Sequence, residues 1–584
     1  MPKDKASFPT DVSFSKSLFF GNILEEMVFP YPEIPKEEKE NLALFLDAFK
    51  QYAQKNIDSS QLDKEEKISK EILQGLAELG LFGAGIPQEY GGAGLSTTCY
   101  ARLMEEVCRH DASLGVTMGA HYSIGLKGLI LFGTEAQKKK YLPDLATGKM
   151  LAAFALTEPG AGSDAAGIQT KAVLSEDKKH YLLNGSKIWI SNGGIANFFT
   201  VFTKTLEPDE KEGQKWKITA FLVTRDMGVR SGPDEHKMGI RGSSTTELYF
   251  ENCKVPAENV LGERGKGFKI AMEILNNGRL GLAAGCVGGG KKAIKLARDH
   301  AVNRKQFRQP IAQFGLIQDK IANMMMDNFA AESMVYMTTS LIDRGVKDYS
   351  LESAICKVFA SESAWRIINE AVQIGAGTAY MKDYPYEQCL RDTRINIIFE
   401  GTNEILRCFI ALGGMQGPGN YLKEVGAALR YPLKGIGPIS DFAIKKISRD
   451  IVGLGDRITK AHPYLKKETS LIEGYVQELA ASVEKTLRKH QKDIWEREFV
   501  QKRISNIAID LYAMICTVSR STHYIEKDGI EKSKYVIELC GAFCDRAARR
   551  IKRNLRSMEI NDDELLKEVA NKTYDIGGYP FDIL

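Results

Sequence analysis

The sequence predicts a mainly α-helical protein with a central β domain. Three observations lead to this fold class. Apolar residues recur every three or four positions from about Glu37 to Lys149, which is the period of an amphipathic helix. Short β-branched runs that alternate in polarity follow from about Leu151 to Val255. Helical periodicity then returns from about Gly262 to Leu412.

The first region is expected to form an N-terminal helical domain over residues 35–150, after an N-terminal extension over 1–34. Segments 36–55 and 67–83 carry their apolar residues on one helical face. The Gly-rich stretch at 85–96 indicates a loop.

The second region, 151–257, is expected to form a compact antiparallel β domain, either a barrel or a sandwich. Its strands are predicted in the runs LAAFALTE, HYLLNGSKIWIS, FFTVFTKT, WKITAFLVTRD and TTELYFENCKV. Asn184-Gly185 in the second run is typical of a two-residue hairpin turn. This run is therefore expected to fold back on itself.

The remaining chain is expected to be helical in two parts. Residues 258–414 predict a helical bundle that only Pro310 and Pro385 interrupt. The stretch GGMQGPGN at 413–420 has the composition of a linker, and we assign 415–462 to a linker segment. Residues 463–584 predict an additional C-terminal helical domain.

Composition excludes several classes of protein. The 584 residues are 43% hydrophobic and carry a formal charge of +4, too balanced for a dedicated nucleic-acid binder. The ten cysteines form no CxxC pair and the eight histidines no HExxH motif, so we expect no metal site and a reducing compartment. The N-terminus resembles neither a signal peptide nor a transit peptide. We therefore expect a soluble, cytoplasmic protein.

Two motifs in the β region could contact a ligand. The turn LTEPGAGSD, Leu156 to Asp164, has small residues that let backbone N–H groups approach an anion, and Ser163 adds a hydroxyl donor. A plain β-turn is the alternative. Trp189 and Ser191 lie two apart on one strand, hence on one face, and could flank a planar ring. Core packing of Trp189 is the alternative here.

A third motif, IIFEGTNEILR, contains a candidate general base. Glu400 follows three apolar residues, Ile397 to Phe399, and precedes Gly401 and the next predicted helix. A carboxylate among apolar side chains loses hydration, which raises its pKa toward neutrality and suits it to remove protons. A glutamate that points to water is the alternative.

Five motifs together resemble one family. LTEPGAGSD, KIWISNGG, NRKQF, QIGAG and FEGTNEI stand in the order and spacing of the acyl-CoA dehydrogenase flavoproteins, whose helix–β–helix layout also matches. The extra C-terminal helical region, VFPYPEIP near the N-terminus and LLNGSKIWISNGG resemble the very-long-chain branch. The resemblance implies FAD as cofactor and a long-chain acyl-CoA as substrate.

The resemblance also implies roles for individual residues. Glu400 matches the catalytic base, which removes the proton α to the thioester while flavin N5 takes the β-hydride. Its backbone N–H and a flavin ribityl hydroxyl are expected to hold the carbonyl oxygen. The residues expected to bind FAD, some of them across a subunit interface, are Leu156, Thr157, Ser163, Trp189, Ile190, Ser191, Arg304, Phe307, Gln373, Ile374, Gly375, Ala376, Gly377, Thr402, Asn403 and Glu404.

The expected substrate residues lie near the base and along an acyl channel. They are Ser163, Asn276, Arg279, Phe399, Gly401, Gly125 and Gly128. The two last glycines match positions that keep the channel deep in the long-chain branch, and helix–helix contact is the alternative. Two residues depart from the family pattern: Ala376 stands where many members have glycine, and Ser191 replaces a threonine.

The implied partners are an electron-transferring flavoprotein and a second subunit in a homodimer. An acyl-CoA oxidase, and a scaffold that assembles a respiratory complex, are the alternative functions. The stretch 433–458 places Ile444, Ile447, Ile451, Leu454 and Ile458 on one face of a predicted basic helix. We expect this helix to contact the inner face of a membrane peripherally, and packing against the protein is the alternative.

Overall fold

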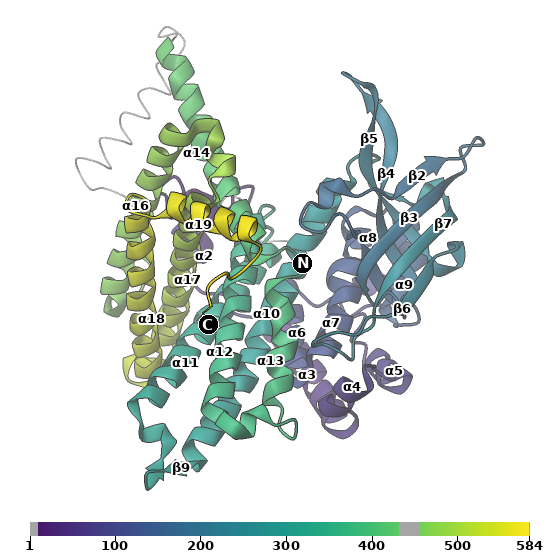
Figure 1. Ribbon diagram of the computed structural model, residues 1–584. Coiled ribbons are helices and arrows are strands. Elements are labelled where there is room, and N and C mark those ends of the chain that lie inside the picture. The colour runs from purple at the N-terminus through teal and green to yellow at the C-terminus, as the bar shows by residue number, and fades with distance from the viewer. Residues whose placement is uncertain (1–9, 431–455, 583–584) are drawn as a thin grey trace. The chain divides into compact units, whose positions relative to one another are not determined.

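The computed structural model describes residues 10–430 and 456–582 (Figure 1). These ranges contain the predicted mainly helical fold with a central β region. The chain forms two compact units. The first contains the residues up to Ser13 and Glu26–Leu406, and the second contains Phe14–Glu25 and the chain from Arg407 onward. The boundary between the units falls inside one helix, α14 (Asn403–Arg430).

The first unit begins with the predicted N-terminal helices. They are α2 (Glu25–Val28), α3 (Lys36–Asn56), α4 (Ser59–Glu65), α5 (Lys70–Glu78), α6 (Thr97–His110), α7 (Ala112–Gly119), α8 (Lys127–Phe132) and α9 (Glu135–Ala146). A single π-helical turn, η2 (Ala120–Gly125), joins α7 to α8. It packs against both the first strand and α10, so it links the helices to the sheet.

The β region is one eight-stranded sheet. Its strands are β1 (Ala152–Ala155), β2 (Lys171–Leu174), β3 (His180–Ser191), β4 (Phe198–Asp209), β5 (Gly213–Thr224), β6 (Arg230–Asp234), β7 (Thr245–Pro256) and β8 (Val260–Leu261). They follow the order β6-β7-β3-β2-β4-β5-β8, with β1 beside β4.

The sheet differs from the predicted one in two respects. Strands β1 and β2 each pair with β4 in parallel, so the sheet is mixed rather than antiparallel throughout. The outer strands β6 and β8 do not pair with each other, so among the described residues the sheet is open and a closed barrel is excluded. Apolar side chains from six of its strands, including Phe199, Phe221 and Phe250, fill one continuous core.

The predicted hairpin at Asn184-Gly185 was wrong. β3 continues through both residues, and the register against β7 shifts between Leu183 and Gly185, as at a β-bulge. The Asn184 side chain accepts a hydrogen bond from the Asn252 backbone N–H (2.9 Å) instead of closing a turn. Gly185 has φ +144°, and a Cβ there would lie 2.6 Å from Thr170 Oγ1. Glycine is needed here because the strand bulges and Thr170 lies close to it. An Asn-Gly dipeptide suits such a bulge as well as a hairpin turn.

Long helices follow the sheet and form the predicted bundle. They are α10 (Gly267–Asn303), α11 (Gly315–Asp343), α12 (Ser350–Tyr380) and α13 (Tyr386–Arg394), with a short hairpin of β9 (Lys305–Gln306) and β10 (Gln309–Pro310) after α10. Helix α10 packs against α6, α11 and α12 (Figure 1). It also contacts α13, so each of the other bundle helices α11, α12 and α13 packs on it.

The second unit is entirely helical in its described part. It contains α1 (Phe14–Leu18), most of α14, α16 (Lys466–His490), α17 (Glu498–Asp528), α18 (Ile530–Ser557) and α19 (Asp563–Ile576). Helices α16 to α19 lie where the additional C-terminal helical domain was predicted.

The predicted linker at 413–420 was also wrong, because these residues lie inside α14. A Cβ at Gly414 would lie 2.2 Å from the Phe19 ring, and one at Gly417 would lie 2.8 Å from the Phe20 ring. The glycines let two phenylalanines approach the helix and do not mark a turn. The predicted membrane-contacting helix at 433–458 falls outside the described residues, apart from its last three. Within the described ranges, no helix is long and apolar enough to cross a membrane.

Helix α12 contains one residue with non-helical backbone angles, Ala376, at φ 49° and ψ −135°. This conformation strains any residue with a Cβ by about 1–3 kcal/mol and suits glycine. Ala376→Gly should therefore raise the melting temperature of the purified protein by about 1–2 °C, since relief of strain exceeds the added entropy of the unfolded chain.

The matched control is Ala43→Gly, an exposed alanine inside the regular helix α3. There the same change should lower the melting temperature, because glycine is unfavourable in a regular helix by about 1 kcal/mol. If both variants melt earlier than the parent protein, Ala376 is not strained.

Candidate active site

The candidate base lies in a sharp turn. Glu400 follows a 3₁₀ turn (Ile395–Ile397) and precedes α14. Glu400 has φ 55° and Gly401 has φ 92°, so two successive residues adopt the left-handed conformation. A glutamate rarely does so, and such residues concentrate at functional sites. The turn directs the Glu400 side chain back toward α10.

A glycine of α10 makes room for the carboxylate. A Cβ at Gly278 would lie 3.0 Å from Glu400 Oε2, 3.1 Å from Oε1 and 2.6 Å from Ile124 Cγ2. Sequence analysis did not identify Gly278. Among the described residues, Glu400 Oε2 has no hydrogen-bond partner, although it is buried. An unpartnered carboxylate oxygen is free to accept a proton from a bound molecule.

Burial raises the pKa of the Glu400 carboxyl to about 7, and the positive charges of Arg279 and Lys357 limit the rise. Loss of hydration disfavours the charged form, and nearby cations favour it. The prediction of a carboxyl with a pKa near neutrality is thus supported by its surroundings. A base with this pKa is well matched to proton removal at neutral pH.

Arg279 holds the backbone of the base. Its Nε donates to the Glu400 carbonyl oxygen (3.2 Å), and its Nη1 donates to Asn276 Oδ1 (2.9 Å). The Asn276 carbonyl in turn accepts a hydrogen bond from Ser353 Oγ (2.5 Å). Arg279 and Asn276, both predicted near the substrate, therefore lie beside Glu400. The Glu400 backbone N–H has no acceptor among the described residues, so it can donate to a ligand oxygen.

A buried lysine, Lys357 of α12, holds the residues that follow the base. Its Nζ donates to the Gly401 carbonyl oxygen (2.8 Å) and to Asn403 Oδ1 (2.8 Å). Sequence analysis missed Lys357. The signal was available, because it is the one charge in the run AICKVFA.

The glycine turn of the β region is fixed by a buried ion pair. Lys187 Nζ contacts Glu158 Oε1 at 2.7 Å and donates to the Leu156 carbonyl oxygen (3.0 Å). Glu158 also accepts a hydrogen bond from the Thr170 backbone N–H (3.0 Å). Beyond this anchor, Cβ atoms at Gly160 and Gly162 would meet no atom within 4 Å. The turn is thus rigid at its base and open above its glycines.

The Trp189 side chain lies beside this turn and faces outward. The Ile188 backbone N–H donates to the Thr157 carbonyl (3.0 Å), which places β3 alongside the turn. The β3–β7 register shifts between Lys187 and Ile190, and Trp189 has φ 56°. Trp189 is 62% exposed in this chain, which excludes core packing. An exposed indole beside open glycines fits the planar ring and the phosphates of a flavin dinucleotide.

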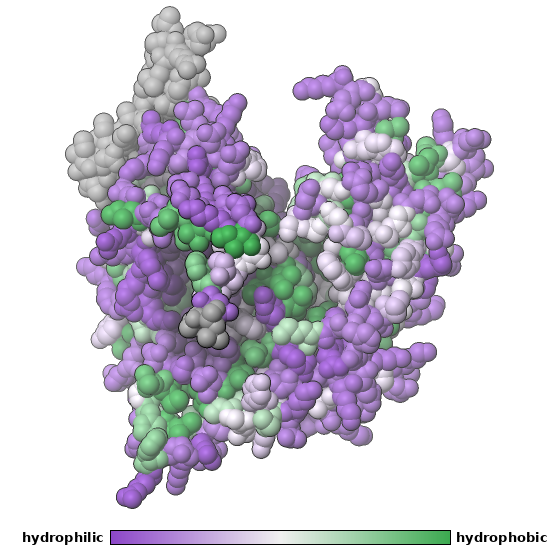
Figure 2. Space-filling view, viewed as in Figure 1, coloured by the Kyte–Doolittle hydropathy of each residue, from purple (hydrophilic) through white to green (hydrophobic). Residues whose placement is uncertain are grey.

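A third group of predicted residues lies far from the base. Arg304 follows the C-terminal end of α10, 25 residues beyond Arg279, or about 37 Å along the helix. Arg304 and Thr378, the residue after segment 373–377, line one open groove. Phe307 is 89% exposed and has φ 49°. Figure 2 shows apolar side chains exposed at this end of the bundle, near β9.

Several predicted ligand residues have their side chains inside the protein. The Ile190 side chain belongs to the sheet core, and the Ile374 side chain belongs to the bundle core. The Asn403 side chain is bound by Lys357 and Ser361. These three residues can contact a ligand only through their backbone. By contrast, Ser163 and Glu404 are exposed, and Thr157, Ser191, Phe399 and Thr402 are partly exposed.

The surroundings of Gly125 and Gly128, which were predicted to keep an acyl channel deep, are tightly packed. A Cβ at Gly125 would lie 2.4 Å from the Ala120 carbonyl and 2.8 Å from Ala152 Cβ. A Cβ at Gly128 would lie 2.8 Å from Ile274 Cδ1. Both glycines allow close packing, and their predicted role in an acyl channel stays a prediction.

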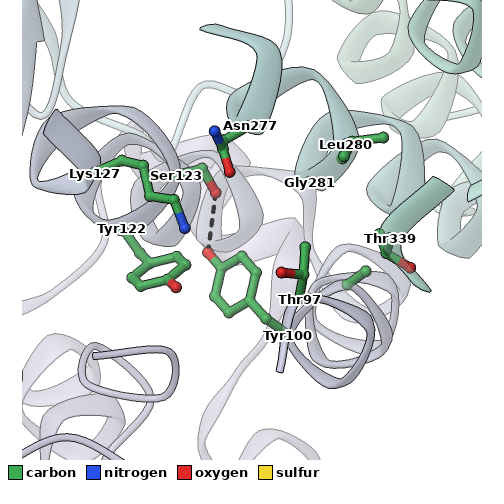
Figure 3. Close-up of a pocket in the computed structure, with 10 residues that line it drawn as sticks. Thr97, Tyr100, Tyr122, Ser123, Lys127, Asn277, Leu280, Gly281 and Thr339 are labelled. Carbon is green, nitrogen blue, oxygen red and sulfur yellow. Dashed lines mark hydrogen bonds between the residues drawn. The ribbon is translucent and has the colours of Figure 1, made fainter. Parts of the chain in front are cut away.

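A small pocket does lie nearby, between α6, η2 and α10 (Figure 3). Its volume of about 20 Å³ holds little more than a water molecule. Tyr100 and Ser123 share a hydrogen bond across it (3.2 Å), and Asn277 and Gly281 line its α10 side. A Cβ at Gly281 would lie 3.1 Å from Ser123 Oγ, one helical turn from the contact of Gly278 with Glu400.

Comparison with protein families matches four models to successive parts of the chain. The N-terminal, middle and C-terminal domains of acyl-CoA dehydrogenase match residues 39–149, 153–253 and 265–414. The model described as the ACAD9/ACADV C-terminal domain matches residues 463–579.

Individual proteins are similar over nearly the whole chain. The very long-chain specific acyl-CoA dehydrogenase of Rattus norvegicus is 45% identical over 568 residues, which cover 96% of this chain and 86% of the rat protein. A probable acyl-CoA dehydrogenase of Bacillus subtilis is 35% identical over 93% of this chain and 91% of its own length. The crystal structure of an acyl-CoA dehydrogenase complexed with FAD from Bacillus anthracis is 34% identical, has a TM-score of 0.80 and covers 95% of this chain and 94% of that one. The chain therefore belongs to the acyl-CoA dehydrogenase family.

Proposed function

We propose that this protein catalyses the FAD-dependent α,β-dehydrogenation of long-chain acyl-CoA thioesters. The observation that carries the proposal is the state of Glu400. Its carboxyl has a pKa of about 7, an unpartnered Oε2 and a backbone N–H without a protein acceptor in the described ranges. Family membership and the similarity to an FAD-bound structure support FAD as the cofactor.

In the reaction, Glu400 removes the proton from the α-carbon and keeps it as a carboxylic acid. The Glu400 backbone N–H donates to the thioester oxygen, on which negative charge develops. Arg279 keeps the peptide in this orientation through the Glu400 carbonyl oxygen. When bound, FAD supplies the acceptor for the hydride that leaves the β-carbon, and the product is the α,β-unsaturated thioester.

The residues that would hold FAD form the glycine turn and the strand beside it. Backbone groups at Leu156 and Thr157 and the hydroxyl groups of Ser163 and Ser191 can donate to it. The Trp189 indole can cover the ring. An apolar acyl chain that enters the site would displace water from around Glu400, which would raise the pKa of its carboxyl and make it a stronger base.

We further propose that the substrates are long-chain acyl-CoAs and that the electrons pass to an electron-transferring flavoprotein rather than to oxygen. The match to the ACAD9/ACADV C-terminal domain supports this choice over an acyl-CoA oxidase. The intact set of Glu400, Arg279 and glycine turn supports an enzyme over a scaffold without activity.

The enzyme is proposed to act as a homodimer. Arg304 and Arg279 are about 37 Å apart along α10, a span longer than one extended dinucleotide. Arg279 is expected beside the substrate and Arg304 beside FAD, and this span is too long for both to serve one site, so each Arg304 is proposed to bind the cofactor of another subunit. The exposed Phe307 and Leu316 give this end of the bundle an apolar surface that a second copy can cover.

The first test replaces the base. Glu400→Gln should retain FAD and bind acyl-CoA, yet the rate of flavin reduction by palmitoyl-CoA should fall about 10²–10⁴-fold, because the amide cannot accept the proton. Anaerobic stopped-flow bleaching of the flavin measures this rate, with butyryl-CoA as a poor substrate for comparison. Glu526→Gln, an exposed glutamate of α17, is the control. Near-normal bleaching in Glu400→Gln would rule out Glu400 as the base.

The second test uses pH. Burial raises the pKa of Glu400 to about 7, and only the ionised carboxylate acts as a base. The rate of flavin reduction should therefore rise with pH through about 7 and level off above about 8, and it should fall about tenfold per unit below about 6. A rate that stays constant from pH 5 to 8 would contradict this assignment.

The third test concerns assembly. Light scattering of the FAD-loaded protein should give twice the mass of the 584-residue chain, because each cofactor site needs Arg304 of another subunit. Arg304→Ala should lower FAD retention without unfolding the chain. A monomer with full FAD occupancy would exclude the shared site.

A further inference from the structure

Lys357 lies within the bundle with none of its surface exposed to water. A buried ammonium is unfavourable unless it is paired or fully hydrogen-bonded. Among the described residues its hydrogen-bond partners are a carbonyl oxygen and an amide oxygen, at Gly401 and Asn403, and no carboxylate. Both partners belong to the turn that carries Glu400. The charge is thus placed at this turn without a direct ion pair to neutralise it.

Two buried cations hold successive carbonyl groups of this turn. Arg279 of α10 binds the Glu400 carbonyl, and Lys357 of α12 binds the Gly401 carbonyl. The left-handed angles of Glu400 and Gly401 orient these two carbonyls toward different helices. Loss of either cation would leave a buried carbonyl without a partner and relax the turn.

Few charged groups face this pair. Glu400 is influenced by Arg279 and Lys357. Lys357 is influenced by Glu400, by Arg279 and Cys286 on α10, and by Glu362 on its own helix. Burial lowers the pKa of Lys357 to about 8, so it remains mostly charged at pH 7. Glu362 also accepts a hydrogen bond from the Asn403 amide (3.2 Å), and Glu400 has the larger effect on the pKa of Lys357 of the two acids.

On the basis of the proposed function, we infer that Lys357 is a positioning residue for the base: it fixes the turn after Glu400 and supplies positive charge that favours the ionised carboxylate. Lys357 contacts neither substrate nor reacting atoms. Its effect on the reaction passes through the geometry and the charge state of Glu400.

Three substitutions separate the two effects. Lys357→Met removes both the charge and the hydrogen bonds, Lys357→Gln removes the charge but keeps a donor, and Lys357→Arg keeps the charge. The reaction measured is anaerobic flavin reduction by palmitoyl-CoA in FAD-loaded enzyme between pH 5.5 and 9.5. Infrared difference spectra give a second readout that needs no turnover. The band of the protonated Glu400 carboxyl is assigned by its absence in Glu400→Gln, and its intensity is then followed as a function of pH.

Removal of a nearby cation raises the pKa of a carboxyl by about one unit. Lys357→Met and Lys357→Gln should therefore shift the acid limb of the rate profile, and the infrared titration, upward by about one pH unit. The rate at pH 7 should fall about fivefold, and the rate at pH 9 should stay within about twofold of the parent. Lys357→Arg should restore the parent profile.

The control is Lys291→Met, a lysine of α10 that pairs with Glu105 (2.6 Å) and Glu332 (2.5 Å), away from Glu400. This variant should leave the acid limb of the rate profile unshifted, whatever its effect on stability. Equal loss of rate at every pH in both neutral Lys357 variants, with an unshifted infrared titration, would overturn the inference and leave Lys357 with a structural role alone.

Failure of the proposed function gives a different result. In that case the parent enzyme is not bleached by palmitoyl-CoA, or Glu400→Gln keeps its activity. The infrared titration still reports the effect of Lys357 on Glu400, because it needs no substrate.

Discussion

The burial of one carboxylate against a glycine is the constraint on which the rest of the site depends. Glu400 reaches the α10 surface only because Gly278 has no side chain. A Cβ at Gly278 would lie within about 3 Å of both Glu400 carboxylate oxygens. A carboxylate so deprived of water requires compensating charge, and the bundle supplies Arg279 from α10 and Lys357 from α12. The packing of α10 on α12 therefore fixes both the position and the basicity of the group.

Periodicity predicted the fold well because it records which faces are buried. The helical regions and the five principal strands follow from it. Glycine was the source of two errors. At Asn184-Gly185 and in the stretch at 413–420, glycine was interpreted as a turn former, yet the structure uses it for a bulge beside Thr170 and for contact with Phe19 and Phe20. A glycine in the sequence shows that no side chain is present at that position, but it does not show which neighbouring residue occupies the space.

The site could be predicted only where one residue carries the chemistry. Glu400 was identifiable from its apolar neighbours together with the family motif around it, whereas Lys357 and Gly278 act through contacts between helices that are distant in sequence. Backbone angles were equally inaccessible. Glu400, Trp189, Phe307 and Ala376 all adopt positive φ, although none is glycine. Such strain persists only where surrounding contacts enforce it, so it becomes visible only in the folded chain.

The buried pair of Lys187 and Glu158 has a consequence for how the protein takes up its cofactor. The pair ties the glycine turn to β3 through contacts within the chain alone. The turn needs no dinucleotide to acquire its shape, so binding is not opposed by the entropy of ordering a loop. The glycine turn should then have the same backbone conformation with and without FAD. The rate of cofactor exchange should be set by the dissociation of FAD and not by refolding of the turn.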